Sequence, residues 1–345
     1  MTLIQQPHDP THIPGEAPVV EDEQSFEQRE VAGLSQGQIV RRRFVRHKGA
    51  MVSLVVLVLI IVLATTSIGW GPIPGWWKWD YNTVVPPNPD QGPTMSLRPT
   101  WLGGAGITIG DHPFGLDNEK ARDMFALTMR GIQQTLVVIG VLAVLAVSIG
   151  VSVGAIAGYY GRWADSALMR FVDVILVIPL LLIAAVAVYS FDIGGVWSVA
   201  LALGLFLWTG LARLVRAEFL ALKEREFVVW SQSIGASAFR IIWRHILPNA
   251  MAPVLVAMTL GIPAAILTES GLSFLGLGVQ PPHATWGNIL NEGKDAIELA
   301  WWLSVYPGMA ILVTVLSYNL LGEGIRDALD PRLRQSGGRV VTRGR

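Results

Sequence analysis

Residues 225–249 read REFVVWSQSIGASAFRIIWRHILPN, a charged and amphipathic stretch between two apolar segments that are each long enough to cross a bilayer. Gly235 favours the left-handed conformation that ends a helix, and Ser237 is well placed to cap the next helix. The stretch therefore predicts two short helices that meet at a bend.

The second of these predicted helices has two distinct faces. Arg240 and Arg244 occupy one face, and Pro248 favours the end of the helix. The opposite, apolar face carries Phe239, Ile242, Trp243, Ile246 and Leu247. A narrower stripe on the first helix comprises Phe227, Trp230 or Ser231, and Ile234. From amphipathicity alone, the pair fits a position among lipid headgroups as well as a docking role.

The order of residues resembles the EAA loop in permease subunits of ATP-binding cassette importers, which has the pattern EAA-x3-G-x9-I-x-L-P. Gly235, Leu247 and Pro248 stand in register with this pattern. The Glu-Ala-Ala positions hold Val229, Trp230 and Ser231, and His245 replaces the Ile. The flanking residues 225–228 and 240–249 are similar to the dipeptide and oligopeptide (DppC/OppC-like) branch. The resemblance therefore favours docking on a cytoplasmic partner.

Composition and hydropathy indicate a polytopic membrane protein. Of 345 residues, 52% are hydrophobic and 15% are charged, and the formal net charge is zero. The absence of cysteine excludes disulfides, thiolate metal sites and cysteine catalysis. Hydropathy predicts six spans, at approximately 50–69, 132–157, 166–190, 196–216, 250–273 and 300–322. The expected fold is an all-α bundle of six transmembrane helices, and the resemblance implies the type I importer permease (MetI-like) fold.

Lys and Arg residues gather at 41–48, at 213–244 and at 326–345. The positive-inside rule therefore places both termini and the 224–249 loop in the cytoplasm. The resemblance implies that the membrane is the bacterial inner membrane. The predicted parts of the chain are a disordered acidic tail at 1–40, a basic flank and first transmembrane helix at 41–69, an extracytoplasmic loop at 70–130, a permease core at 131–325 and a cytoplasmic tail at 326–345.

Two further segments resemble the same family. Residues 112–123 are similar to the HPxGTDxxGRD signature that precedes the second span in C-type dipeptide permeases, with Leu116 in place of Thr and Ala121 in place of Gly. Two metal ligands at i and i+4 on a helix with a third nearby are not evident, so a hydrogen-bonded loop is the better interpretation. Residues 269–282 and 286–287 resemble the fifth span and the loop after it. The resemblance covers about residues 38–335.

Glu269 is an ionisable residue in the predicted fifth span, where charge is expensive. One hypothesis places it on the translocation path or in coupling. The other makes it a carboxylate near the end of the span, hydrogen-bonded to backbone that is freed around Pro263 or Gly271. The sequence leaves both hypotheses open.

Several function classes are disfavoured by missing motifs. The sequence contains no GxxxxGK[ST] phosphate loop, so the chain is not expected to hydrolyse ATP. The run GVSVG at 150–154 matches GxSxG only inside a predicted membrane span and not at a strand-to-helix elbow, and no HExxH helix is present, which disfavours a membrane-embedded enzyme. A secondary transporter is the main alternative from another class, although inverted repeats are not evident. A channel would need a recognisable selectivity ring.

The resemblance implies a non-catalytic permease subunit that translocates di- or oligopeptides delivered by an extracytoplasmic binding protein. It implies a second, related permease and two ATPase subunits that would hold ATP and Mg²⁺. No cofactor, metal or nucleic-acid site is expected in this chain. The implied coupling residues are the anchors Phe227, Trp230, Phe239 and Trp243, the register-fixing Glu226, Arg240 and Arg244, and Gly235, Ser237, Leu247 and Pro248. Family members for nickel chelates or glutathione remain an alternative, and dipeptide is not ranked above oligopeptide.

Overall fold

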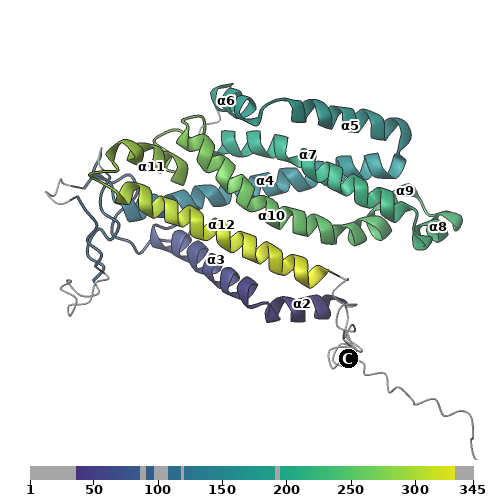
Figure 1. Cartoon of the computed structure of the whole chain (residues 1–345), viewed down its shortest axis with the longest axis horizontal. Coiled ribbons are helices and arrows are strands. Elements are labelled where there is room, and N and C mark those ends of the chain that lie inside the picture. Colours follow the sequence, from purple (N-terminus) through teal and green to yellow (C-terminus); the bar gives the residue numbers. More distant parts are fainter. Residues whose placement is uncertain (1–35, 86–90, 97–107, 118–119, 191–194, 331–345) are drawn as a thin grey trace, which may run out of the picture.

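The computed structural model describes residues 36–85, 91–96, 108–117, 120–190 and 195–330. This part of the chain is built from helices, with isolated β-bridges in the loop that follows the first span (Figure 1). The first helix, α2, begins at Gln36 and ends at Arg46, so residues 36–40 are helical where a disordered tail was predicted. The rest of that tail and residues 331–345 lie outside the described residues.

Five helical stretches combine the length and the apolar composition needed to cross a membrane. They are α3 (Lys48–Ser67), α4 (Met124–Tyr160), α7 (Gly195–Lys223), the continuous stretch Ala238–Phe274 and α12 (Trp302–Leu329). They correspond to five of the six predicted spans. Helix α4 begins earlier than predicted because Asp123 caps it, with Oδ1 accepting a hydrogen bond from the Ala126 N–H at 2.8 Å.

The predicted span at 166–190 is two shorter helices, α5 (Arg162–Val177) and α6 (Leu180–Ser190). They are separated at Ile178, whose backbone is extended with φ −77° and ψ 126°. Ile178 precedes Pro179, and the proline ring disfavours the helical conformation in the preceding residue. The expected single helix was therefore wrong in its continuity, although both pieces are helical; α5 carries four charged residues, whereas α6 carries none.

The centre of the bundle is the contact between α4 and α7. Three glycines of α4, Gly150, Gly154 and Gly158, face α7. A Cβ atom on Gly154 would lie 2.5 Å from the Ala212 carbonyl oxygen and 2.7 Å from Val215 Cβ. Such distances are shorter than any ordinary contact, so glycine is needed there for the helices to approach closely.

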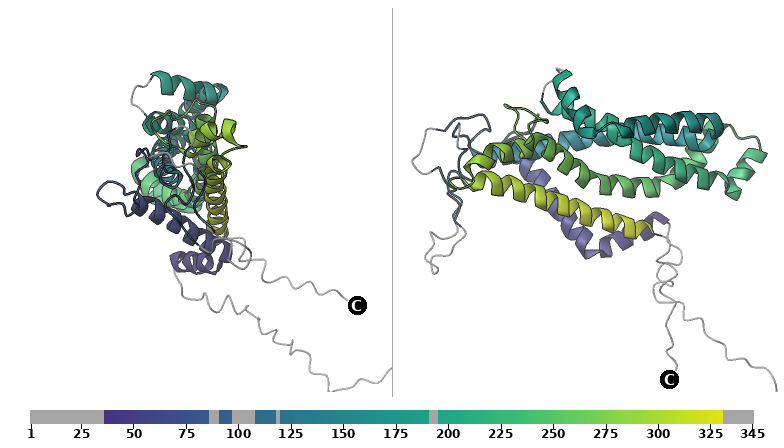
Figure 2. Two further views of the ribbon diagram at one scale, coloured as in Figure 1. Left: turned by 90° about the vertical axis from the view of Figure 1, so that its left-hand side faces the viewer. Right: turned by 45° about the horizontal axis from the view of Figure 1, so that its top comes forward.

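The two ends of the bundle carry different structures, as Figures 1 and 2 show. Helix α12 lies beside α3 and α10 (Leu247–Phe274) along the bundle. The loop that connects α3 to α4 gathers at one end with α11 (Trp286–Gly293) and the short 3₁₀ helix η3 (Lys294–Ala296). At the opposite end lie α8 (Glu226–Ser233) and α9 (Ala238–Arg240). We call these the loop end and the coupling end.

Candidate functional site

Helix α8 forms the first half of the predicted helix pair at the coupling end. It ends at Ser233 with Ile234 as the C-cap residue, and Gly235 follows with a φ of 79°. The Gly235 N–H donates to the Gln232 carbonyl at 2.9 Å, and the Ala236 N–H donates to the Ser231 carbonyl at 3.1 Å. This pair of bonds is a Schellman motif, which satisfies carbonyl groups that the end of a helix leaves unpaired. The predicted left-handed bend at Gly235 is confirmed.

The second half begins at Ser237, whose hydroxyl accepts a hydrogen bond from the Arg240 N–H at 3.4 Å. The predicted cap is therefore confirmed. Helix α9 then runs without a break through the π-helix η2 (Ile241–Ile246) into α10. The coupling end is thus joined directly to a membrane-spanning helix.

The predicted helix end at Pro248 was wrong. Pro248 is the second residue of α10, which begins directly after the π-helix, and the helix continues past it. Proline has no N–H, and its ring clashes with the carbonyl four residues earlier in a regular α-helix. A π-helical turn is wider, with Leu247 N–H bonded to the carbonyl of Ile242 five residues back. The wide turn therefore accommodates the proline where the sequence pattern indicated a stop.

One face of the helix pair packs tightly against the bundle. Val228, Ile241 and Ile246 are buried in a cluster with Phe219 of α7 and Ala250 of α10. Ile246 was expected on the apolar face, whereas Val228 and Ile241 were not singled out. The π-helical turn shifts the register, so that a purely α-helical pattern could not identify Ile241.

The other face is apolar and exposed. Its members are Phe227, Trp230, Ile234, Phe239 and Trp243, with exposed fractions of 40%, 70%, 82%, 71% and 55%. We call these five residues the outer apolar patch. The rings of Phe239 and Trp243 lie with centroids 5.9 Å apart. Trp230 stands at an Ala position of the family pattern, and it points away from the bundle while its neighbour Ser231 is buried.

All four predicted anchors therefore belong to the outer apolar patch. The predicted charged residues Glu226, Arg240 and Arg244 are also exposed, and none forms an ion pair with the residues that the structure describes. Gly235, Ser237 and Pro248 are exposed, and Leu247 is half-buried. The structure thus brings the predicted coupling residues together on one end of the molecule.

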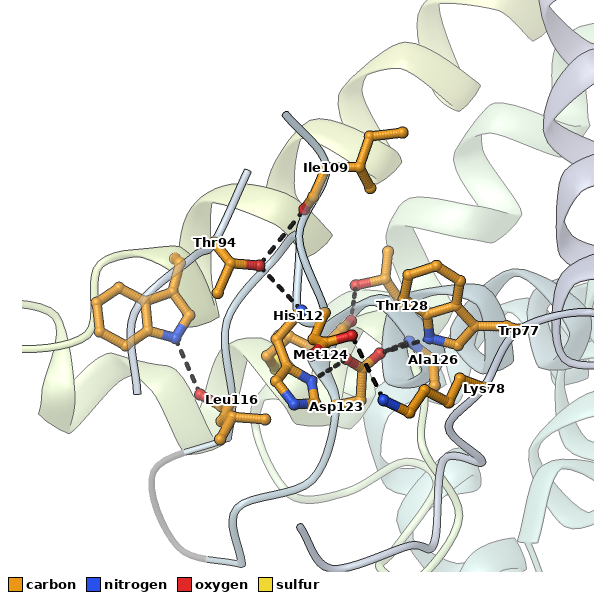
Figure 3. A network of polar contacts seen from close by, with 12 residues as sticks. Trp77, Lys78, Thr94, Ile109, His112, Leu116, Asp123, Met124, Ala126 and Thr128 are labelled. Carbon is orange, nitrogen blue, oxygen red and sulfur yellow. Dashed lines mark hydrogen bonds and ion pairs between the residues drawn. The ribbon is translucent and has the colours of Figure 1, made fainter. Parts of the chain in front are cut away.

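At the loop end, Asp123 organises the signature-like segment (Figure 3). Its Oδ2 lies 2.8 Å from His112 Nδ1, and its Oδ1 accepts a hydrogen bond from the Trp77 indole N–H at 3.2 Å. Arg122 donates to Asp117 at 2.6 Å and to Glu292 of α11 at 3.3 Å. The interpretation as a hydrogen-bonded loop is confirmed. Across the described ranges, no group of three His, Asp or Glu side chains is arranged to hold a metal ion.

Glu269 lies on α10 near the loop end and is buried. Its Oε1 accepts a hydrogen bond from the Ser273 hydroxyl at 2.9 Å, and the Ser273 oxygen accepts from the Val279 N–H at 3.1 Å. The carboxylate is hydrogen-bonded as one hypothesis expected, but through a serine side chain rather than through backbone freed near Pro263 or Gly271. A place for Glu269 on the translocation path stays a prediction.

This helical bundle, with five helical stretches long and apolar enough to cross a membrane, is that of a polytopic membrane protein, and comparison with known proteins specifies the family. Residues 150–335 match the family described as binding-protein-dependent transport system inner membrane component. Residues 35–94 match the N-terminal transmembrane domain of oligopeptide transport permease C. The chain belongs to the binding-protein-dependent transport family of inner membrane components. It is a non-catalytic, multi-pass subunit of an inner-membrane transporter.

Individual relatives cover most of the chain. The oligopeptide transport system permease protein OppC of Bacillus subtilis is 36% identical over 85% of this chain and 88% of its own length. The dipeptide transport system permease protein DppC of Bacillus subtilis is 36% identical over 96% of this chain and 97% of its own length. A putative peptide permease protein of Brucella ovis is 38% identical over 84% of this chain and 89% of its own length.

Proposed function

We propose that this permease passes di- or oligopeptides across the inner membrane and that separate ATPase subunits drive it through the 224–249 loop. In this proposal an extracytoplasmic binding protein delivers the peptide, and a second, related permease completes the path. ATP and Mg²⁺ belong to the ATPase subunits. The chain termini and the coupling end face the cytoplasm, which the distribution of Lys and Arg favours.

The relatives support peptides as the cargo. Two of them are named as oligopeptide and dipeptide permeases, and a third is named as a peptide permease. The family match at the N-terminal part also refers to an oligopeptide permease. These names support the peptide branch over nickel chelates or glutathione, and they do not rank dipeptides above oligopeptides.

The observation that carries the coupling role is the outer apolar patch. Five large apolar side chains are exposed together on a segment whose opposite face is packed into the bundle. An exposed apolar surface with charged residues beside it is typical of a protein-binding surface. Figure 1 shows α8 projecting beyond the neighbouring helix ends, a shape that suits insertion into a partner cleft better than lying flat among headgroups.

A docked partner would move two spans at once. Helix α8 follows α7 after a two-residue connection, and α9 is continuous with α10. Val228, Ile241 and Ile246 are buried in one cluster with residues of α7 and α10, so the 224–249 loop packs against both spans. When ATPase subunits close, a displacement of this rigid unit can therefore bias the bundle between inward- and outward-facing states.

The bend at Gly235 provides the sharpest test of coupling. A Cβ atom at this position would meet nothing within 4 Å, so a substitution acts through backbone conformation rather than through a clash. Gly235→Val should lower ATP-dependent peptide uptake roughly tenfold, because a β-branched residue strains a left-handed bend. Gly235→Asn is the matched control, since asparagine tolerates this conformation. Uptake is measured in proteoliposomes that contain the whole transporter, and normal uptake by Gly235→Val would count against the proposal.

Removal of the patch tests docking directly. The double variant Trp230→Ala with Phe239→Ala should reduce co-purification of ATPase subunits with the tagged permease, while leaving the permease inserted. Trp163→Ala, which removes an 82% exposed tryptophan from α5, is the control. If both variants retain the same amount of ATPase, the patch is not the docking surface.

A further inference from the structure

A cavity of about 220 Å³ lies at the loop end, away from the coupling residues. Its walls come from four separate parts of the chain: the segment after α3, residues 130–137 of α4, the start of α7 and the connection between α10 and α11. Trp70, Trp197 and His283 contribute aromatic rings to these walls, and Arg130 of α4 contributes the positive charge. The cavity thus combines one cation with apolar and aromatic surface.

Arg130 is held by neutral groups. Its Nη1 donates to Gln133 Oε1 at 2.8 Å. With the Gln134 amide oxygen oriented toward Arg130, that oxygen accepts from Nε at 3.1 Å and from Nη2 at 3.0 Å. The guanidinium also lies over the ring of Tyr81, 4.7 Å from its centroid. Among the described residues no carboxylate lies within ion-pair distance of Arg130.

The two glutamines are built into the fold. Gln133 is 1% exposed and Gln134 is 5% exposed. The Gln133 amide also donates to the carbonyl oxygens of Ala64 at 2.8 Å and Gly69 at 2.9 Å, which fixes it against the end of α3. Arg130 is therefore oriented by buried side chains that do not neutralise its charge. Such preorganisation is what a receptor for an anion requires.

The remaining donors suit a carboxylate. A guanidinium has five N–H groups, and the bonds to the two glutamines use three of them. One N–H therefore remains on each terminal nitrogen. Donors on both terminal nitrogens of one guanidinium can reach the two oxygens of a carboxylate. The aromatic residues that line the same cavity offer apolar surface to the last side chain of a peptide.

The His283 side of the cavity depends on a close approach to Gly195. A Cβ atom on Gly195 would lie 2.8 Å from His283 Cδ2 and 2.9 Å from Nε2, and the φ of Gly195 is 60°. Glycine at this position therefore allows the imidazole to approach the start of α7. The cavity wall is consequently a specific arrangement of the fold rather than a gap between loops.

We propose that this cavity binds the C-terminal carboxylate of the transported peptide, with Arg130 as the anion-binding residue and Gln133 and Gln134 as positioning residues. The inference rests on the proposed peptide transport, in which the loop end faces the binding protein. Every unmodified peptide carries this carboxylate, whatever its sequence. A binding site for the C-terminal carboxylate lets one permease recognise peptides of varied sequence, while the aromatic walls tolerate different side chains.

The test measures binding of labelled trialanine and of its C-terminal amide to the complete nucleotide-free transporter in nanodiscs without binding protein. Wild type should bind the free acid more tightly than the amide. Arg130→Gln should weaken free-acid binding ~10-fold and leave amide binding unchanged, because the charged hydrogen bonds are lost. Arg130→Lys keeps the charge but lacks the planar fork, so its affinity for the free acid should lie between those of wild type and Arg130→Gln. Lys120→Gln, which removes an exposed cation from the same end, should match wild type.

Other outcomes overturn the inference. One is that wild type shows no measurable binding of trialanine. The others are that Arg130→Gln weakens binding of the acid and of the amide equally, or that it weakens neither. Comparing nanodiscs of phosphatidylcholine with and without phosphatidylglycerol distinguishes a site for a lipid phosphate from a site for the peptide carboxylate. If Arg130→Gln removes tightly bound phosphatidylglycerol without changing the acid preference, the cavity holds a lipid phosphate instead. ATP-dependent uptake of trialanine with binding protein is measured on the same wild-type preparation, and its absence contradicts the proposed function rather than this site alone.

Discussion

Asp123 is a single residue that connects the loop end to a membrane-spanning helix. Its carboxylate caps α4 through Ala126 and also contacts His112 and Trp77. The residue is fully buried, so these contacts replace the water that an exposed carboxylate would bind. The folding of the loop and the start of α4 therefore depend on the same side chain.

We predict that Asp123→Ala lowers the free energy of unfolding by about 1–3 kcal/mol, because it removes the helix cap and leaves the donors of Trp77 and His112 without their acceptor. Asp123→Asn keeps a side-chain oxygen that can accept the capping hydrogen bond, so its free energy of unfolding should fall less than that of Asp123→Ala. The measurement is the thermal unfolding midpoint of the purified transporter in detergent. A midpoint unchanged by the alanine substitution would show that the cap does not hold the loop.

Glu269 allows a second prediction at the same scale. Glu269→Leu conserves approximate volume but leaves the Ser273 hydroxyl without its acceptor, so it should destabilise the bundle by about 1–3 kcal/mol. Glu269→Gln can still accept this hydrogen bond and should be milder. Thermal unfolding ranks the two variants, and peptide uptake shows whether the carboxylate has another role. Wild-type stability combined with lost uptake in Glu269→Gln would favour the translocation path.

At the scale of elements, the π-helix η2 sets which side chains of α9 face outward. A π-helical turn contains about one residue more than an α-helical turn. Removing this extra residue would rotate α9 relative to α10 by about 100°. Phe239 would then leave the exposed face. The position of Phe239 in the outer apolar patch therefore depends on this irregular turn, which we expect Pro248 to help maintain.

Pro248→Ala should restore a regular turn, because alanine supplies the missing N–H and removes the ring clash. Phe239→Cys gives a readout, since the natural chain contains no cysteine. Labelling of this cysteine by a membrane-impermeant thiol reagent should slow in the Pro248→Ala background. Pro253→Ala, which changes another proline inside α10, is the control. Equal labelling rates in both backgrounds would show that Pro248 does not determine the turn.

These elements also show how far the sequence alone could lead. Gly235 and Ser237 act through local backbone geometry, so their roles were predictable. Pro179 interrupts a predicted span, whereas Pro263 and Pro307 lie inside continuous helices. Hydropathy averages over a window and cannot separate these cases, because packing around each proline decides the outcome. The Arg130 cavity was not predictable, since it joins four segments that are distant in sequence.

At the scale of the whole molecule, the close contact of α4 with α7 limits where a substrate can pass. Cβ atoms on Gly150, Gly154 and Gly158 would lie 2.5–3.0 Å from atoms of α7. A seam with no room for a methyl group offers no route for a peptide between these helices. This packing supports the proposal that the path runs between this chain and a second permease.

The final prediction is that the purified chain alone does not transport peptides. Liposomes that contain this chain should show no trialanine uptake above that of empty liposomes, even with an imposed proton or sodium gradient. Addition of the second permease, the ATPase subunits and the binding protein should produce uptake that requires ATP. The same complex with Gly235→Val provides an assembled but poorly coupled control. Gradient-driven uptake by the single chain would instead identify a secondary transporter, because such a protein needs neither a partner permease nor ATP.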